Sequence, residues 1–143
     1  MINRETFKLS VIIPCFNEKN TINIILNKII ESLKNYKILN YEIIIIDDCS
    51  NDGTRELLNK IQDPKIKIFL HDRNQGKGGA IQTAIKKITG ELIIIQDADL
   101  EYDPDQYPNL LKPFIETEAD IVYGSRFLGG GDYNRLLFFW HSV

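Results

Sequence analysis

The sequence predicts a three-layer α/β/α domain built on a mainly parallel sheet. Two observations support this fold class: short apolar runs alternate about four times with helical segments, and polar residues follow each run. Such alternation is typical of parallel strands joined by right-handed helical crossovers. Because 143 residues suffice for a domain with its own core, we expect residues 1–143 to form a single domain.

The expected strands are short apolar runs bounded by turn residues. Four consecutive isoleucines at 43–46 suit a strand that is buried on both faces. Pro14 is expected to end the first strand. In chain order, the expected strands are 9–13, 42–47, 66–70, 92–96 and 119–123.

The expected helices show a different periodicity. Between about residues 20 and 35, apolar residues recur every three or four positions, as on one face of an amphipathic helix. Gly53 is expected at a turn with positive φ, immediately before a short helix. Pro108 and Pro113 leave the bounds of the last helix open. The other expected helices are 54–61, 80–88 and 105–118.

Composition and charge describe an ordinary globular domain and argue against several function classes. The chain is 43% hydrophobic, and its formal net charge of −3 argues against nucleic-acid binding. It has no run of about 18 apolar residues and no signal-peptide pattern. Cys15 and Cys49 follow apolar runs, so we expect reduced thiols in a cytoplasmic protein.

The final residues, 135–143, read as the start of an apolar helix that has no stop signal. We therefore expect this chain to be the N-terminal part of a longer protein. An uncovered aromatic helix would also favour a homo-oligomer.

The pair Asp97 and Asp99 is the most informative feature of the sequence. Both follow the apolar run 92–96, so both can turn toward one point at the exit of a strand. Two like charges so close repel by about 1–4 kcal/mol, and Mg²⁺ or Mn²⁺ would relieve that repulsion. Phosphates commonly fill the open positions of such a metal. On the motif alone, two solvated loop aspartates remain the alternative.

Polar residues follow the other expected strands as well. Because ligands of parallel sheets collect at the carboxyl ends of the strands, these residues indicate a functional cleft at that edge. Neither a dinucleotide fingerprint nor a P-loop is present, so phosphates would be held through a metal. The residues at the strand exits are Asn17, Glu18, Asp47, Asp48, Asp72, Arg73, Asp97 and Asp99.

Four motifs in order resemble a family 2 glycosyltransferase of the Rossmann-like GT-A fold. They are VIIPCFNE at 11–18, IDDCSNDGT at 46–54, NQGKGGA at 74–80 and QDADL at 96–100. A further motif, YGSRF at 123–127, is similar to polyprenol-phosphate sugar transferases of the dolichol-phosphate mannose synthase type. The resemblance covers nearly the whole chain, and it implies that the acceptor-side region begins after about residue 126.

The resemblance implies a binding site for a GDP- or UDP-sugar. Asp47 would accept hydrogen bonds from the donor base, and Asp48 would organise the turn at 50–54 beside the nucleotide. The residues expected around the base and ribose are Pro14, Phe16, Asn17 and Glu18. Asn17 and Glu18 have the alternative role of capping the following helix. The residues expected near the phosphates are Gly76, Lys77 and Gly78, at a helix N-terminus, with a flexible turn as the alternative.

The same resemblance assigns the catalytic residues Asp97, Asp99 and Arg126. Asp99 would ligate Mg²⁺ or Mn²⁺ directly, and Asp97 would contact the ribose or the water shell of the metal. Arg126 would bind the acceptor phosphate, because a guanidinium can donate two hydrogen bonds to it; an ion pair with the acidic cleft is the alternative. His71 and His141 lack metal-site spacing and are expected to be structural or on the surface.

The expected reaction is an inverting, metal-dependent transfer of a sugar to a polyprenyl or dolichyl phosphate. Such an acceptor is already anionic and needs no general base. A sugar hydroxyl acceptor, in polysaccharide or glycan assembly, is an alternative and needs a carboxylate base, which would lie beyond residue 143. A further alternative is a fragment that binds a nucleotide sugar but does not transfer the sugar. We expect the full-length protein at the cytoplasmic face of a membrane, held there by its acceptor or its missing C-terminal region.

Overall fold

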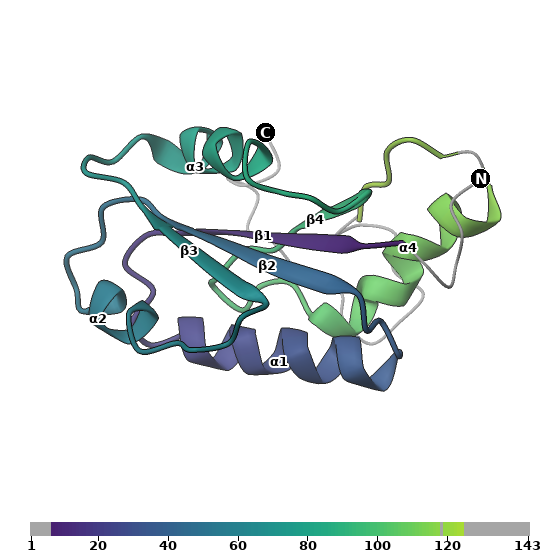
Figure 1. Ribbon diagram of the computed structural model, residues 1–143, viewed down its shortest axis with the longest axis horizontal. Coiled ribbons are helices and arrows are strands. Elements are labelled where there is room, and N and C mark those ends of the chain that lie inside the picture. The colour runs from purple at the N-terminus through teal and green to yellow at the C-terminus, as the bar shows by residue number, and fades with distance from the viewer. Residues whose placement is uncertain (1–6, 118, 125–143) are drawn as a thin grey trace, which may run out of the picture.

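The domain alternates strands and helices along the chain, as the sequence predicts (Figure 1). The structure is a computed structural model and describes residues 7–117 and 119–124. In chain order the elements are β1 (Leu9–Cys15), α1 (Ile22–Asn35), β2 (Tyr41–Asp47), α2 (Thr54–Leu58), β3 (Ile66–Leu70), α3 (Gly76–Ile85), β4 (Leu92–Ile95), the 3-10 helix η1 (Pro104–Gln106) and α4 (Tyr107–Glu116).

The four strands form one parallel sheet in the order β3-β2-β1-β4. β1 and β2 pair in register over their whole length, from Leu9 opposite Tyr41 to Cys15 opposite Asp47. Because all strands run the same way, their carboxyl ends meet at one edge of the sheet. The loops that carry the predicted site residues leave from this edge.

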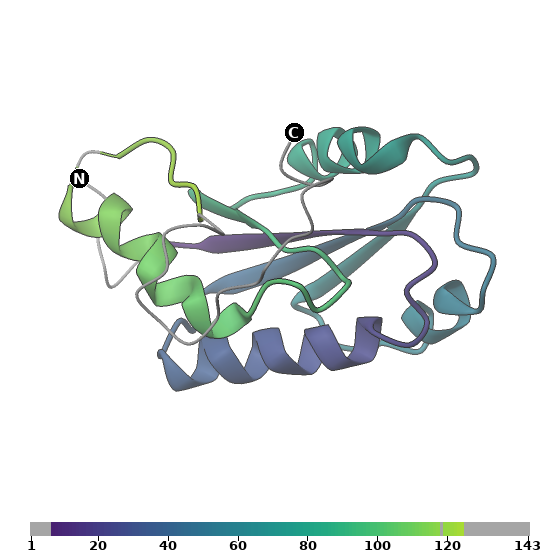
Figure 2. The same cartoon turned by 180° about the vertical axis from the view of Figure 1, so that it is seen from behind.

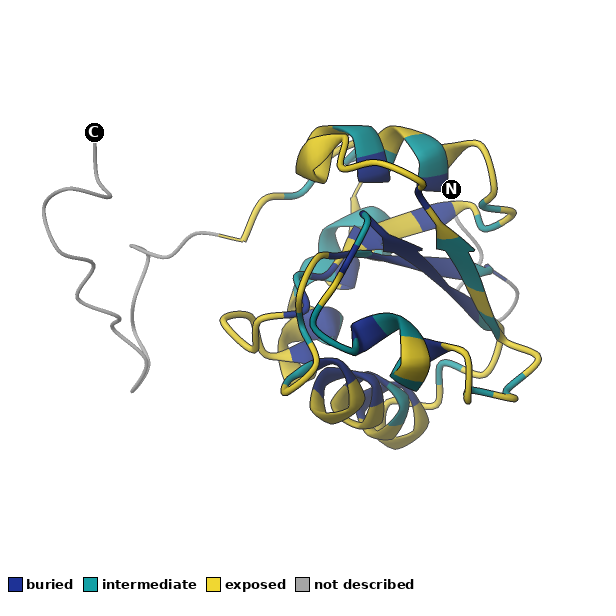
Figure 3. Ribbon diagram, turned by 90° about the vertical axis from the view of Figure 1, so that its left-hand side faces the viewer, coloured by how far each residue is buried: buried dark blue, intermediate teal, exposed yellow. Residues whose placement is uncertain are grey.

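Helices cover both faces of the sheet, which confirms the three-layer prediction (Figures 1 and 2). On one face, Ala80 and Ala84 of α3 pack against isoleucines of β1 and β2. The other face carries the larger core, built from α1, α2 and α4. The residues of α1 buried there are Ile22, Ile25, Leu26, Ile29, Ser32 and Leu33. Seen from the carboxyl edge, the buried central strands lie between the helices (Figure 3).

Two strand predictions are wrong in detail. Pro14 does not end β1, which continues to Cys15. β4 pairs only with residues 9–12 of β1, so at Pro14 the strand has one sheet neighbour and the missing N–H is tolerated. The fifth strand expected at 119–123 is absent from the described residues 119–124. Ile121 and Tyr123 are exposed there, and an apolar run forms a strand only where it pairs with a neighbour.

Three helices also differ from the predicted ones. α3 begins at Gly76 rather than at residue 80 and ends at Ile85 rather than at residue 88, and its buried residues Ala80 and Ala84 pack against the sheet. α2 ends at Leu58 rather than at residue 61. The last helix is split into η1 and α4, with Pro104 opening the first as expected for proline at a helix start.

A buried carboxylate ties together the opposite, amino-terminal edge of the sheet. Glu42 is 2% exposed and accepts hydrogen bonds from Ser10 Oγ (2.8 Å), Lys67 Nζ (2.8 Å) and Thr89 N (2.5 Å). Burial alone raises the pKa of Glu42, but these bonds outweigh burial and lower it to about 2. The network joins three strands and the loop before β4, and it lies at the far end of the sheet from the site residues.

The helices of the described part of the chain are short or polar. None of those within residues 7–117 and 119–124 is long and apolar enough to cross a membrane.

Candidate functional site

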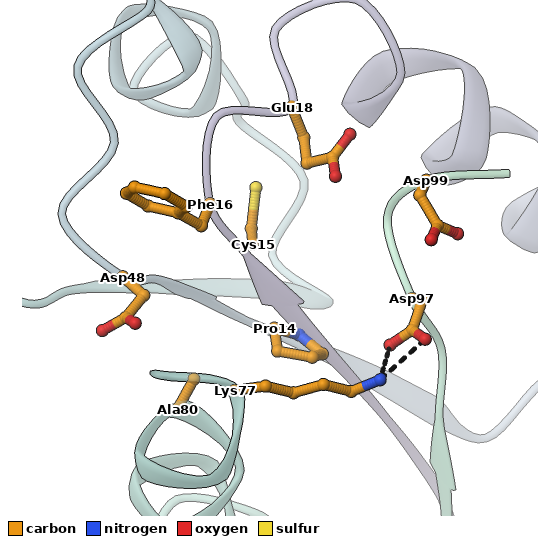
Figure 4. Close-up of a pocket in the computed structure, with 9 residues that line it drawn as sticks. All are labelled: Pro14, Cys15, Phe16, Glu18, Asp48, Lys77, Ala80, Asp97 and Asp99. Carbon is orange, nitrogen blue, oxygen red and sulfur yellow. Dashed lines mark hydrogen bonds and ion pairs between the residues drawn. The ribbon is translucent and has the colours of Figure 1, made fainter. Parts of the chain in front are cut away.

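A cavity of about 210 Å³ lies at the carboxyl edge of the sheet. It is bounded by the end of β1, the loop after β4 and the start of α3 (Figure 4). Its lining residues are Pro14, Cys15, Phe16, Glu18, Asp48, Lys77, Ala80, Asp97 and Asp99. All of these except Cys15 and Ala80 were site residues predicted from the sequence.

The loop after β4 directs both acidic side chains of the motif to the pocket, whereas the residue between them, Ala98, is buried in the core. Gln96 holds this loop in place, because its Nε2 donates to Asp97 O (3.1 Å) and Tyr102 O (3.0 Å). Tyr107 OH, at the start of α4, donates to Gln96 Oε1 at 2.9 Å. Burial raises the pKa of Tyr107, so this hydroxyl stays a donor. Gln96 is therefore structural, as predicted.

Lys77 is the cation that lines this acidic pocket. Its Nζ lies 2.6 Å from Asp97 Oδ1 and 2.7 Å from Asp97 Oδ2. The lysine side chain reaches this position from α3 by passing beneath Pro14 (Figure 4). Asp99 has a different partner, because its Oδ1 accepts a hydrogen bond from Glu101 N at 3.0 Å. The two aspartates of the motif are thus held differently.

Asp48 lines the pocket and organises the entrance to α3. Its Oδ1 accepts from His71 Nδ1 (2.7 Å) and from Gln75 N (2.8 Å). Burial alone would raise the pKa of Asp48, but these hydrogen bonds outweigh it and lower the pKa. The role predicted for Asp48 in the 50–54 turn is wrong; Asp52 Oδ1 accepts from Thr54 N there, at 3.0 Å. His71 is structural, as expected, and its Nε2 pairs with Thr83 Oγ1 at 2.9 Å.

Asp47 is turned away from the pocket into the protein. Its side chain is fully buried, and its Oδ2 accepts from Arg55 Nε (2.5 Å) and Ser50 N (3.2 Å). Arg55 Nη2 also donates to His71 O, so the pair joins β2, α2 and β3. Asp47 Oδ1 has no hydrogen-bond partner among the described residues. The structure therefore brings Asp48, rather than Asp47, to the pocket.

The segment after β1 contributes an aromatic and an acidic side chain. Phe16 is 47% exposed at the pocket. Glu18 both lines the pocket and caps α1, since its side chain accepts from Thr21 Oγ1 and its carbonyl accepts from Ile22 N. Asn17 does not line the pocket; its Oδ1 accepts from Asn51 N at 2.9 Å and fixes the neighbouring loop.

The thiol of Cys15, which lines the pocket, is unreactive. It is 2% exposed, and burial together with the negative charge of Asp47 raises its pKa to about 12. The thiol stays protonated near neutral pH and is a poor nucleophile. Both Cys15 and Cys49 are free cysteines, as the sequence predicted.

Glycines shape the start of α3 beside the pocket. Gly76 has φ +75°, and Gly53, at the predicted turn, has φ +104°; both values lie in the region that favours glycine. A Cβ at Gly78 would meet nothing within 4 Å, so the surface there is open. Gly76 and Gly78 do not line the cavity themselves, but they flank Lys77, which does.

The side chains of this site alone could hold a divalent cation only weakly, and a bound ligand would have to strengthen that binding. The described residues contain no group of three or more His, Cys, Asp or Glu side chains that could hold a metal ion. Asp97 and Asp99 supply carboxylate oxygens, the ligands that Mg²⁺ and Mn²⁺ prefer. Two such residues leave most coordination positions open, so the oxygens of a diphosphate would have to complete the shell.

The remaining predicted residues lie outside the part of the chain that the structure describes. These are Arg126, assigned to the acceptor phosphate, and His141.

A parallel sheet with an Asp-x-Asp pair at its carboxyl edge defines a nucleotide-sugar-binding domain of the GT-A class. The sequence matches Glycosyl transferase family 2 over residues 10–139. The chain belongs to this family, and the resemblance found in the sequence is confirmed.

Curated relatives are sugar transferases that are much longer than this chain. A dolichol-phosphate mannosyltransferase from Pyrococcus furiosus is 32% identical over 133 residues, which cover 92% of this chain and 37% of the relative. An undecaprenyl-phosphate 4-deoxy-4-formamido-L-arabinose transferase from Photorhabdus laumondii is 35% identical, covering 80% and 36%. The chain thus spans little more than a third of the length of these relatives.

Solved structures share the fold. The mannosyltransferase PcManGT from Pyrobaculum calidifontis, in complex with GDP-Man and Mn²⁺, is 30% identical with a TM-score of 0.61, covering 73% of this chain and 31% of that one. TarS from S. aureus, in complex with UDP-GlcNAc, is 27% identical with a TM-score of 0.62, covering 76% and 31%.

Proposed function

We propose that this protein transfers a sugar, with inversion, from a GDP- or UDP-sugar to a polyprenyl or dolichyl phosphate. One observation carries the donor side: Asp97, Asp99 and Lys77 converge with Phe16 and Asp48 on a single pocket at the carboxyl edge of the sheet. The names of two relatives, which transfer to lipid phosphates, support the acceptor. Family membership supports the reaction class.

The nucleoside would lie against the segment after β1. Phe16 offers an exposed aromatic face for stacking of the base, and Glu18 can accept hydrogen bonds from ribose hydroxyls. Asp48 can accept from the ring N–H of the base. Guanine and uracil both carry such an N–H, so Asp48 suits a GDP- or a UDP-linked donor equally well.

The charges of the pocket favour a metal-bridged diphosphate. Four carboxylates line the pocket, from Glu18, Asp48, Asp97 and Asp99, against the single ammonium of Lys77. A diphosphate would be repelled by this lining unless a cation entered with it. Asp99 would ligate Mg²⁺ or Mn²⁺ directly, with Asp97 beside it. When bound, the metal would stabilise the charge that develops on the leaving diphosphate.

The start of α3 supports the same placement of the phosphates. Asn74 Oδ1 accepts the N–H of Gly76, the first residue of this helix, at 3.0 Å, and the N–H groups of the next residues, Lys77 and Gly78, are the ones that could donate to an anion. On the acceptor side, a lipid phosphate is already anionic and needs positioning rather than a base. Arg126 would supply that positioning.

The donor half of the proposal is tested by calorimetry. GDP and UDP are titrated into the 143-residue chain with and without Mn²⁺, using wild type, Asp99→Asn and, as a control, Asp105→Asn on η1 outside the pocket. We expect Mn²⁺ to tighten binding of one nucleotide in wild type and in Asp105→Asn, and this gain to disappear in Asp99→Asn. Equal binding with and without Mn²⁺ in wild type would contradict the metal assignment.

The acceptor half is tested by transfer from a radiolabelled donor. Polyprenyl phosphate and an oligosaccharide compete in one reaction with the 143-residue chain. Label in the lipid fraction supports the proposal, and label in the oligosaccharide overturns the acceptor. A chain that binds the nucleotide but transfers no label alone would be the binding part of a longer enzyme.

A further inference from the structure

We propose that Lys77 acts as an internal counter-ion: it neutralises Asp97 while the pocket is empty and moves to the donor diphosphate when a divalent cation takes Asp97. This inference rests on the proposed function, because it assumes that a metal and a diphosphate enter this pocket. It assigns to Lys77 a role in the order of ligand binding, beyond contact with a phosphate.

The starting point is the contact between Lys77 and Asp97. The ammonium lies 2.6 and 2.7 Å from the two oxygens of one carboxylate, so it occupies the side of Asp97 that faces the pocket (Figure 4). A metal cation could not share those oxygens at normal ligand distances without lying close to the ammonium. Lys77 and the metal therefore compete for Asp97.

Asp99 does not share this competitor. Its Oδ1 accepts from a backbone N–H, that of Glu101, and it has no ion-pair partner among residues 7–117 and 119–124. A cation can therefore meet Asp99 first and reach Asp97 only after Lys77 has left. This difference gives the two aspartates separate places in the order of binding.

Lys77 can leave because its side chain is 57% exposed, and exposed ion pairs are weak. The place to which it would move is close by. The N–H of Gly76 already donates to Asn74 Oδ1 at 3.0 Å, but the surface at Gly76 and Gly78 is open, with nothing within 4 Å of a Cβ built at either glycine, and the N–H groups of Lys77 and Gly78 could meet a phosphate there. A phosphate against these N–H groups would lie within reach of a lysine on the same turn.

The inference predicts two effects of opposite sign for Lys77→Met. Binding of Mn²⁺ alone should become tighter by about threefold to fivefold, the range expected when an exposed ion pair no longer competes. Binding of GDP or UDP with saturating Mn²⁺ should become weaker by about tenfold, because a charge-assisted hydrogen bond to phosphate is lost. A lysine that only bound phosphate would give the second effect without the first.

The experiment measures free Mn²⁺ by electron paramagnetic resonance as Mn²⁺ is titrated into each protein, without nucleotide and then with GDP or UDP. The proteins are wild type, Lys77→Met, Asp97→Asn and the double variant. Lys86→Met, the same change at the other end of α3, controls for net charge. We expect the tighter Mn²⁺ binding of Lys77→Met to be absent from Lys86→Met, and Lys77→Met to add nothing in the Asp97→Asn background.

The outcomes separate this inference from the proposed function. Unchanged or weaker Mn²⁺ binding by Lys77→Met, with normal metal-dependent nucleotide binding in wild type, overturns the inference and leaves the proposed function standing. A gain that persists in the Asp97→Asn background means that Lys77 acts through its general field and also overturns it. If wild type binds no Mn²⁺ even with GDP or UDP, the proposed metal site fails, and the inference fails with it.

Discussion

The adjacent residues Asp47 and Asp48 allow a sharp test of the site, because the structure gives them opposite surroundings. Asp48 lines the pocket, whereas Asp47 is fully buried against Arg55. We compare Asp48→Asn with Asp47→Asn, two variants that make the same chemical change one residue apart. The first should weaken binding of GDP or UDP, and the second should lower the stability of the fold.

The structure sets the size of both effects. A hydrogen bond from a ligand to a charged group is worth about 1.5–3 kcal/mol, so Asp48→Asn should weaken nucleotide binding by about tenfold to a hundredfold. Its amide oxygen can still accept from His71 and Gln75, and the cost in stability should be about 1 kcal/mol or less. Asp47→Asn breaks an ion pair whose arginine is 29% exposed, and it should cost about 2–3 kcal/mol.

The assay combines urea unfolding with calorimetry of GDP and UDP in the presence of Mn²⁺. Binding is measured below the unfolding transition of each variant, so that only folded protein is compared. Wild-type affinity in Asp48→Asn, or a larger loss of affinity in folded Asp47→Asn than in Asp48→Asn, would refute the assignment of Asp48 to the nucleoside.

Three further results are expected. The folded pKa of Glu42 is about 2, below its ordinary value of 4.5, so its ionisation stabilises the fold above pH 4.5 and this stabilisation is lost as the pH falls toward 2. Glu42→Gln should therefore lower the free energy of unfolding at pH 7 by about 3 kcal/mol, and urea unfolding should show the gap closing in acid. Iodoacetamide at pH 8 should label Cys49 well before the buried Cys15, with the order read by mass spectrometry; equal rates would contradict the raised pKa of Cys15. Gln96→Met removes the hydrogen bonds to Asp97 O and Tyr102 O and should weaken Mn²⁺-dependent nucleotide binding severalfold; unchanged binding would show that the loop keeps its position without Gln96.

The sequence predicted the fold and most of the pocket because both depend on local patterns. Isoleucines 43–46 define a buried strand, and the polar residues after each strand had to meet at one edge once the sheet was parallel. The choice between Asp47 and Asp48 could not be made in this way. Asp47 is the last residue of β2 and Asp48 lies directly after it, and side chains alternate between faces along a strand, so the predicted strand had to be placed to the residue.

One signal could have indicated that Asp47 is turned into the protein. Asp47 follows Ile43 and Ile45 in the alternation, and those residues face the larger core. An aspartate on that side needs a buried cationic partner, and Arg55 lies one short loop further along the chain. The prediction of a fifth strand was wrong for a different reason. The sequence 119–123 has strand propensity, but within the described residues it does not pair with a neighbouring strand.

The two hydrogen bonds at Asp48 Oδ1 bear on any redesign of donor preference. The same oxygen holds His71, at the end of β3, and Gln75, at the entrance to α3. If Asp48 contacts the base as proposed, a substitution there that removes the acceptor oxygen would also release the entrance to the helix proposed to cradle the diphosphate. Libraries for altered base selectivity should vary Asp48 and His71 together, because replacing Asp48 by a residue without an acceptor oxygen would leave both His71 Nδ1 and the backbone N–H of Gln75 without this partner.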